Sequence, residues 1–254
     1  MTQHSTSAGQ PVALVTGSAK RIGKTLITRL HAQGYAVIVH YHHSADAADT
    51  LVTSLNDTRS GSATALQADL SDPQAVKRLG QDALRCFGRL DVLINNASAF
   101  YPTPLNEASP DDWHSLMGSN VQGAYFLTQA VAGALNKTEG VIINMVDMHI
   151  DRPLPEHSLY CMAKSALASL TRSLATELAP DVRVNGIGPG AILWPERDMD
   201  EDDRQAMLAG IPLNRLGSPD DIADTALFLI KARYITGQII YVDGGRSIHA
   251  VASA

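Results

Sequence analysis

The hydrophobic positions of the chain fall into two alternating patterns along most of its length. Short apolar runs predict buried strands, because strands covered on both faces of a parallel sheet are apolar at consecutive positions. These runs are residues 11–15, 36–39, 63–67, 91–95, 141–146, 182–187 and 238–242. Between them, apolar residues recur every three or four positions, which predicts amphipathic helices. The helical segments are residues 21–33, 45–56, 73–87, 109–135, 158–177 and 219–231.

Strands that alternate with helices predict a parallel sheet with right-handed crossover connections. We therefore expect a single α/β domain over residues 11–254, with a doubly wound, seven-stranded parallel sheet, after a disordered tail at residues 1–10. Residues 191–216 interrupt the alternation, because they are loop-like, acidic around 198–203 and contain Trp194. A long segment of this kind beside a strand end is typical of a loop that covers a substrate.

Composition narrows the function without identifying it. The chain has 254 residues, 45% of them hydrophobic, and a net charge of −6 with no cluster of Lys or Arg. This balance argues against a nucleic-acid or membrane surface. Cys86 and Cys161 fit no metal-binding spacing, so we expect reduced thiols, no bound metal and a cytoplasmic protein. The polar N-terminus does not have the pattern of a signal peptide, and no apolar run approaches the ~20 residues that span a bilayer.

Small and polar residues stand at the predicted ends of six strands. They are Gly17, His40, Asp69, Asn96, Asp147 and Pro189. Because ligands of parallel sheets bind at the carboxyl ends of the strands, we expect these residues to surround one site. The first belongs to a glycine-containing turn, residues 16–23, between a strand and a helix. Such a turn brings backbone N–H groups and the positive end of the helix towards a phosphate, and it therefore predicts a dinucleotide site.

The second strand ends in a polar run that consists of His40, Tyr41, His42, His43 and Ser44. Folds that bind NAD usually place an Asp or Glu here, whose carboxylate binds the ribose 2′-hydroxyl. Donors in its place, with Lys20 and Arg21 of the glycine turn, suit a 2′-phosphate and predict NADPH. The alternative is that the histidine run is only a polar loop. Asp69, at the end of the third strand, is expected near the adenine amino group.

Tyr160 and Lys164 lie four residues apart on a predicted helix, so their side chains share one face. A phenol titrates near ~10, and a neighbouring ammonium stabilises the phenolate and lowers that pKa. Such a pair can donate a proton while a C=O or C=N bond is reduced. Taken alone, the same spacing is also that of ordinary residues on a helix surface.

Several ordered motifs together resemble the short-chain dehydrogenase/reductase family over residues 11–242. The matching residues are Thr16, Gly17, Arg21, Ile22 and Gly23, then Asn95, Asn96 and Ala97, then Asn120, Tyr160 and Lys164, and finally Pro189 and Gly190. The resemblance implies a Rossmann-like fold. Two residues depart from the usual family pattern: Arg21 replaces a glycine of the cofactor turn, and Asp147 replaces a catalytic serine.

These departures, with residues 40–44 and 95–104, are similar to pteridine reductases, which reduce biopterin, dihydrobiopterin and folates with NADPH. The residue that matches His43 is commonly Arg in those enzymes. Most relatives are tetramers, so the resemblance also implies a homotetramer. It further implies that Asn120 holds a water molecule behind Lys164.

The resemblance assigns a role to each candidate site residue. Catalysis would fall to Asp147, Tyr160 and Lys164. The residues expected to contact NADPH are Gly17, Arg21, Ile22, Gly23, His40, Tyr41, His42, Ser44, Asp69, Leu70, Asn96, Ala97, Ser98, Met145, Tyr160, Lys164, Pro189 and Gly190. The residues expected to contact the pterin are Arg21, Ser98, Phe100, Asp147 and Tyr160.

The physical chemistry of two of these residues fits a nitrogen heterocycle. A carboxylate at position 147 would repel a developing oxyanion but favour a ring with N–H donors or positive charge. Phe100 would stack on a planar ring, which contributes roughly 0.5–1.5 kcal/mol beyond burial. Two alternatives stay open: a carbonyl reductase of the same family that acts on a ketoacyl thioester, sugar or quinone, and a non-catalytic NADPH-binding sensor.

Overall fold

The computed structural model describes residues 9–194 and 200–249. In this part of the chain seven parallel strands form one sheet, in the order β3-β2-β1-β4-β5-β6-β7. The strands are β1 (Val12–Val15), β2 (Ala36–Tyr41), β3 (Ala63–Gln67), β4 (Val92–Asn95), β5 (Val141–Met145), β6 (Arg183–Pro189) and β7 (Ile239–Val242). The predicted doubly wound seven-stranded sheet is confirmed. Of the tail expected at residues 1–10, residues 1–8 lie outside the described residues.

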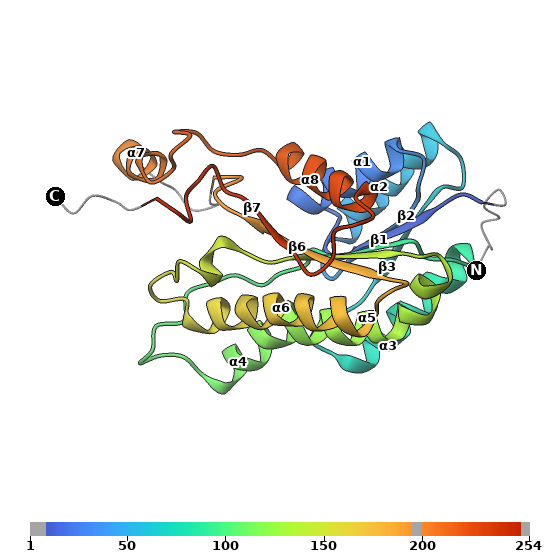
Figure 1. Ribbon diagram of the computed structural model, residues 1–254, viewed down its shortest axis with the longest axis horizontal. Helices are drawn as coiled ribbons and strands as arrows, with labels where there is room; N and C mark the ends of the chain where they lie inside the picture. Colours follow the sequence, from blue (N-terminus) through green and yellow to red (C-terminus); the bar gives the residue numbers. More distant parts are fainter. Residues whose placement is uncertain (1–8, 195–199, 250–254) are drawn as a thin grey trace.

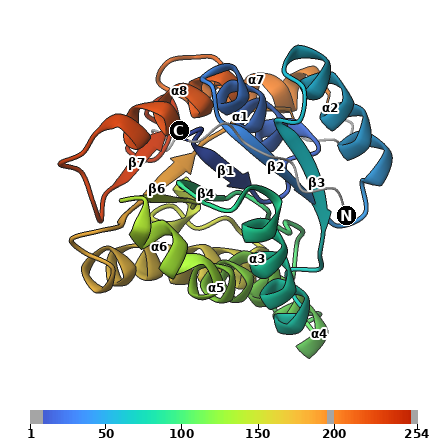
Figure 2. The same cartoon turned by 90° about the vertical axis from the view of Figure 1, so that its right-hand side faces the viewer.

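Helices cover both faces of the sheet (Figures 1 and 2). α1, α2 and α8 pack on one face, and α3, α5 and α6 pack on the other. The helices are α1 (Arg21–Ala32), α2 (Ala45–Thr58), α3 (Pro73–Phe87), α4 (Pro110–Met117), α5 (Gly123–Lys137), α6 (Ser158–Glu177), α7 (Glu201–Ala209) and α8 (Pro219–Lys231). α7 lies at one end of the molecule, beyond the carboxyl ends of the strands (Figure 1).

The central strands are apolar at consecutive positions because the sheet has a hydrophobic core on each face. In β1, Ala13 and Val15 belong to the core under α1, α2 and α8, whereas Val12 and Leu14 belong to the core over α3 and α5. All four side chains are fully buried. Truncation of a fully buried leucine such as Leu14 to alanine typically costs about 2–5 kcal/mol of stability. This rigid sheet positions the loops at its carboxyl edge.

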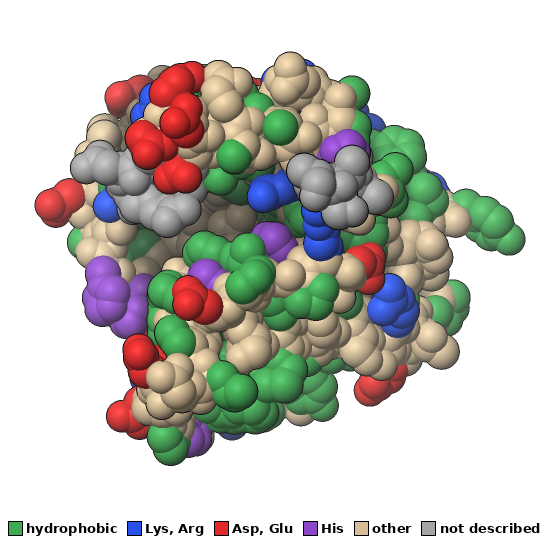
Figure 3. Space-filling view, turned by 90° about the vertical axis from the view of Figure 1, so that its left-hand side faces the viewer, with side chains coloured by type: hydrophobic (Ala, Val, Ile, Leu, Met, Phe, Trp, Pro, Cys, Tyr) green, Lys and Arg blue, Asp and Glu red, His purple; other side chains and the backbone are tan. Residues whose placement is uncertain are grey.

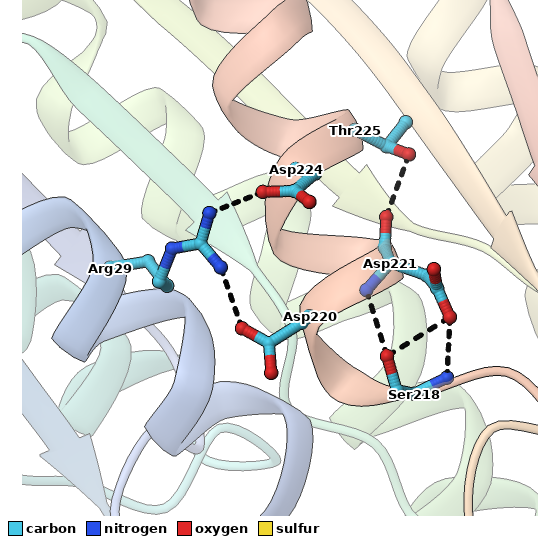
Figure 4. A network of polar contacts seen from close by, with 6 residues as sticks. All are labelled: Arg29, Ser218, Asp220, Asp221, Asp224 and Thr225. Carbon is cyan, nitrogen blue, oxygen red and sulfur yellow. Dashed lines mark hydrogen bonds and ion pairs between the residues drawn. The ribbon is translucent and has the colours of Figure 1, made fainter.

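Side chains at the start of α8 define its N-terminus and attach it to α1. Ser218 and Asp221 form a capping box, in which each side chain accepts a hydrogen bond from the other residue's backbone N–H. Arg29 of α1 donates to Asp220 at 2.6 Å and also to Asp224 (Figure 4). Exposed ion pairs of this kind contribute little stability, so the buried contacts between α1 and α8 dominate their packing.

Two segments differ from the predicted elements. α7 lies within residues 191–216, which were expected to be a loop. None of its side chains is buried, so it has no apolar stripe, although Asp200 caps its start by accepting a hydrogen bond from the N–H of Asp203. The helix predicted over residues 109–135 is divided by a π-helical turn, Gly118–Gln122, between α4 and α5. A short 3-10 turn, Met148–Ile150, follows β5.

None of the helices in residues 9–194 and 200–249 combines the length and the apolar character that a bilayer crossing requires.

Candidate active site

The turn between β1 and α1 leaves the N-terminus of the helix open. Lys20 occupies the N-cap position, and no side chain in the described residues caps the helix. Gly17 and Arg21 both have left-handed backbone conformations, with φ angles of +61° and +52°. A side chain in this conformation costs roughly 1–2 kcal/mol, which a glycine avoids. Position 21 therefore has the geometry that suits a glycine, and Arg21 adopts it in spite of the cost.

A cleft of about 460 Å³ follows the carboxyl ends of β1 to β4. Its lining consists of Gly17, Lys20, Arg21, Ile22, Gly23, His40, His42, Ala68, Asp69, Leu70, Asn96, Ala97, Ser98, Ala99 and Ser119. The molecule is hollowed on the side that bears α7, and acidic side chains gather beside the hollow (Figure 3). Most of the predicted cofactor residues thus share one cleft. Sequence reasoning missed Ala68, Ala99 and Ser119, whose small side chains carry no motif.

His40 does not have the role that the sequence suggested. The expectation was that His40 donates to a 2′-phosphate, but the side chain is buried and both of its ring nitrogens have backbone partners. The N–H of Gly17 donates to His40 Nδ1 at 3.0 Å, and Nε2 lies 3.2 Å from the carbonyl oxygen of Ala68. Burial lowers the pKa of His40 to about 4, so the ring is neutral at neutral pH. The prediction of a phosphate donor at His40 is therefore wrong.

The rest of the histidine run is only partly at the cleft. The exposed His42 lines it, with Nε2 3.8 Å from Asp69 Oδ2. Asp69 Oδ1 accepts hydrogen bonds from the backbone N–H and the hydroxyl of Ser71, at 2.8 and 2.7 Å. Tyr41 and Ser44 are not among the residues that line the cleft.

Asp147 and Tyr160 face each other just beyond the end of β5. Tyr160 Oη donates to Asp147 Oδ2 at 2.6 Å, and the N–H of His149 donates to Oδ1 at 2.8 Å. Lys164, one turn after Tyr160 on α6, donates from Nζ to the carbonyl oxygen of Met145 at 2.8 Å. Its Nζ lies 5.7 Å from the centroid of the Tyr160 ring. Tyr160 and Lys164 are 4% and 2% exposed, so they are not ordinary surface residues.

The electrostatics of this group differ from the expectation that Lys164 lowers the pKa of Tyr160. Burial raises the pKa of the Tyr160 phenol well above its usual range, and the Asp147 carboxylate raises it further, while the Ser98 hydroxyl acts in the opposite direction. Burial lowers the pKa of Lys164 to about 8, although Asp147 acts to raise it. The phenol therefore keeps its proton at neutral pH, and in this state it is a proton donor rather than a base.

Asn120 lies in the π-helical turn and connects α4 to the loop after β4. Its Oδ1 accepts a hydrogen bond from Ser98 Oγ at 2.7 Å, and its Nδ2 donates to the carbonyl oxygens of Ala99 and Leu116, both at 3.0 Å. The wider π turn frees a helix carbonyl, and the Asn120 amide takes up that of Leu116. Asn120 thus positions Ser98, a predicted contact of both ligands.

Phe100 lies beside the catalytic group, which consists of Asp147, Tyr160 and Lys164. It is 55% exposed, so it is not a core aromatic. Its ring stacks on His157 with a centroid distance of 4.8 Å and an interplanar angle of 20°. Its ring also makes an edge contact with Tyr160, at 4.8 Å and 79°. An aromatic side chain with this exposure beside a proton donor can stack on a flat substrate. His157, which no motif indicated, orients it.

Pro189 and Gly190 are not among the lining residues of the cleft. The N–H of Gly190 donates to the carbonyl oxygen of Val242 at 3.0 Å. A Cβ atom on Gly190 would lie 2.7 Å from Asp243, so only glycine permits this close contact. The predicted Pro-Gly turn therefore packs against the C-terminal turn, residues 243–249.

The C-terminal turn also approaches Asp147. Arg152 Nη1 donates to the carbonyl oxygens of Arg246 and His249, at 2.7 and 2.9 Å, and fixes the turn to the segment that follows Asp147. Burial and the charge of Arg152 lower the pKa of Arg246, while Asp147 and Asp243 act to raise it. Arg152 and Arg246 escaped the sequence analysis because neither belongs to a recognisable motif.

Comparison with known proteins decides the family. A family model described as enoyl-(acyl carrier protein) reductase matches residues 17–247. Pteridine reductase 1 of Leishmania tarentolae is 41% identical, over 96% of this chain and 98% of the relative. The chain belongs to the short-chain dehydrogenase/reductase family.

Other members of the short-chain dehydrogenase/reductase family are nearly as similar. Granaticin polyketide synthase putative ketoacyl reductase 2 of Streptomyces violaceoruber is 36% identical, over 92% of this chain and 95% of the relative. The 3-oxoacyl-(acyl-carrier-protein) reductase FabG of Staphylococcus aureus is 35% identical, over 92% and 96%. Like its relatives, the protein is an NAD(P)-dependent oxidoreductase of this family.

The glycine turn fits the nicotinamide dinucleotide of this family. The uncapped N-terminus of α1 offers backbone N–H groups and the positive end of the helix dipole to a pyrophosphate. Gly23, in the first turn, lies against Gly17 and Asn96, where a Cβ atom would come within 2.3 Å of the Gly17 carbonyl oxygen. The Gly17 N–H is already bonded to His40, so the pyrophosphate would be bound by the first turn of α1.

Proposed function

We propose that this protein is an NADPH-dependent pteridine reductase. Its substrates would be dihydrobiopterin or biopterin-type pterins, with dihydrofolate or folate as further candidates, and its products their tetrahydro forms. The observation that carries the proposal is the 2.6 Å hydrogen bond from Tyr160 Oη to Asp147, at a position where the family usually has a serine. The 41% identity to Pteridine reductase 1 supports it.

The carboxylate at position 147 selects the kind of bond that is reduced. A serine hydroxyl donates to a carbonyl oxygen and stabilises the negative charge that develops there. An ionised carboxylate only accepts hydrogen bonds, so it would destabilise an oxyanion but can accept from a ring N–H. A C=N bond in a heterocycle with N–H groups therefore suits Asp147 better than an isolated ketone does.

The catalytic group supports a proton relay. NADPH supplies a hydride when it is bound, and Tyr160 Oη supplies a proton to the ring nitrogen. The resulting phenolate lies beside the Asp147 carboxylate, and two adjacent anions are unfavourable. A proton that reaches Asp147 from solvent returns to Tyr160 through their hydrogen bond. Lys164 contributes a positive charge near the Tyr160 ring at pH values below its pKa of about 8.

Residues at the end of β2 support NADPH over NADH. No carboxylate occupies residues 40–44, where NAD-binding folds place one. Lys20, Arg21 and His42 line the adjacent part of the cleft and can bind a 2′-phosphate. Because His40 is buried and does not contact the phosphate, Lys20 and Arg21 are the main candidates for binding the 2′-phosphate.

The substrate would lie between the cofactor and the aromatic side chain at position 100. Phe100 is exposed beside Tyr160, and Ser98 and Arg21 line the cofactor cleft. A pterin offers a flat ring for stacking and a carbonyl group and ring nitrogens for these polar side chains. We therefore assign Phe100, Ser98 and Arg21 to substrate binding.

A carbonyl reductase is the second candidate, because two relatives at 36% and 35% identity are ketoacyl reductases. Oxidation of NADPH measured with dihydrobiopterin, dihydrofolate, folic acid and an acetoacetyl thioester separates the two. The proposal expects kcat/KM for at least one pterin to exceed that for the thioester. A preference for the thioester, with no pterin turnover, would reject it.

We further propose that the protein forms a homotetramer through its outer helices. Tyr125 of α5, Met162 of α6 and Phe228 of α8 are large apolar side chains exposed to solvent in the single chain. Apolar surface of this kind favours contacts between copies. Sedimentation or light scattering at micromolar concentration tests this proposal, and a monomer would contradict it.

A further inference from the structure

His40 connects the three loops that form the cofactor cleft. It follows Val39 in β2, and its ring nitrogens contact Gly17 after β1 and Ala68 after β3. Its backbone N–H donates to Ser18 Oγ at 3.2 Å. The N–H of Ser18 in turn donates to the carbonyl oxygen of His40 at 2.9 Å. His40 is 1% exposed, so its ring is shielded from bulk solvent.

The partners of the ring fix its protonation state. The Gly17 N–H can only donate, so His40 Nδ1 must be an unprotonated acceptor. The Ala68 carbonyl can only accept, so Nε2 must carry the proton. A single neutral tautomer satisfies both contacts.

The backbone of Gly17 is thereby fixed on both sides of its Cα atom. Its N–H is bonded to His40, and its carbonyl oxygen accepts from Asn96 Nδ2 at 3.2 Å. Gly17 begins the turn with a φ of +61°, and its orientation determines where the first turn of α1 points. That turn would bind the pyrophosphate that NADP(H) and NAD(H) have in common.

We infer that His40 is a positioning residue for the dinucleotide: it fixes the Gly17 peptide, and through it the pyrophosphate site, without touching the 2′-phosphate. This inference rests on the proposed cofactor cleft and not on the proposed pterin substrate. Its consequence concerns cofactor selectivity. A residue that orients the shared pyrophosphate site changes the affinities for NADPH and NADH by the same factor, whereas a residue that binds the 2′-phosphate changes only the first.

The test measures Kd for NADPH and NADH by titration of the purified protein, without substrate. His40→Leu removes the acceptor and leaves a buried N–H unsatisfied, so both Kd values should rise roughly 10-fold or more, with their ratio unchanged. His40→Asn offers an oxygen near the position of Nδ1 and should restore both affinities to within about 3-fold of wild type. Two matched controls are included. His31→Gln alters a buried histidine outside the cleft and should change neither Kd, and Lys20→Gln should weaken NADPH selectively.

The results separate the possible roles of His40. A loss confined to NADPH would overturn the inference and restore His40 as a phosphate contact. Unchanged affinities in the leucine variant would also overturn it. If that variant does not fold, a long-range ¹H–¹⁵N spectrum of the wild-type imidazoles decides, because a ring protonated on Nδ1 at neutral pH contradicts the inference. Failure of the wild type to bind either dinucleotide would reject the cofactor cleft itself, and lack of pterin turnover would leave this result unaffected.

Discussion

Replacement of Asp147 by serine tests the basis of the substrate assignment. The change removes the carboxylate that accepts from Tyr160 Oη at 2.6 Å and restores the residue that is usual in the family. A hydrogen bond to a charged group contributes about 1.5–3 kcal/mol, which corresponds to roughly 10- to 150-fold in rate. Loss of an acid–base group costs about 10²–10⁴. We therefore expect kcat for dihydrobiopterin to fall at least about 100-fold.

The same variant should behave differently with a carbonyl substrate. Turnover of an acetoacetyl thioester should be unchanged or increased in Asp147→Ser, because the serine hydroxyl donates to a carbonyl oxygen. Asp147 is not among the residues that line the cofactor cleft, so Kd for NADPH should stay within about 2-fold of wild type. The pKa of Tyr160 should fall, because the carboxylate that raises it is gone.

Asp151→Ser is the matched control for this experiment. Asp151 lies four residues further along and also accepts a hydrogen bond from a tyrosine hydroxyl group, that of Tyr241. Its replacement should change pterin turnover only a few-fold. Full pterin activity in Asp147→Ser, or an equal loss in both variants, would refute the proposed role of Asp147.

Three further results are expected. In Tyr160→Phe, kcat should fall about 10²–10⁴-fold while NADPH still binds, and near-full activity would reject Tyr160 as the proton donor. Wild-type activity should decline as the pH rises through about 8, where Lys164 loses its charge. Lys164→Arg keeps the charge and should shift this decline to higher pH. If the variant is active and its decline is not shifted, a group other than Lys164 causes the decline. Burial also lowers the pKa of His31 and that of His40, the latter to about 4. As the pH falls, these histidines are therefore protonated in the unfolded chain before they are protonated in the folded protein. The stability that is present above pH ~6.5 is lost as the pH falls towards 4, by about 3 kcal/mol for His40 alone. Equal midpoints of urea unfolding at pH 7 and pH 5 would contradict this expectation.

The strand and helix pattern made the architecture predictable, because burial on both faces of the sheet imposes long apolar runs. Leu14 and its neighbours illustrate this rule. α7 escaped prediction because none of its side chains is buried. The π turn at Asn120 was also missed, since the periodicity of apolar residues does not record the hydrogen bond from the Asn120 amide to Leu116.

The sequence predicted which residues form the candidate site, but it did not predict the role of every one of them. Strand ends converge by topology, so the positions of Asp147, Tyr160 and Lys164 follow from the order of the elements. The direction of a side chain does not follow in the same way. His40 looked like a phosphate donor because it begins a polar run, yet its ring is buried between Gly17 and Ala68. Likewise, the pKa of Tyr160 depends on burial and on Asp147, which spacing alone does not weigh.

A crystal structure of the protein with NADP⁺ and a pterin or an antifolate would test the account most directly. We expect the heterocycle to lie between the nicotinamide and the Phe100 ring, with a ring nitrogen facing Tyr160 and Asp147. A ligand bound outside this space, or an Asp147 side chain turned away from Tyr160 in the complex, would contradict the assignment.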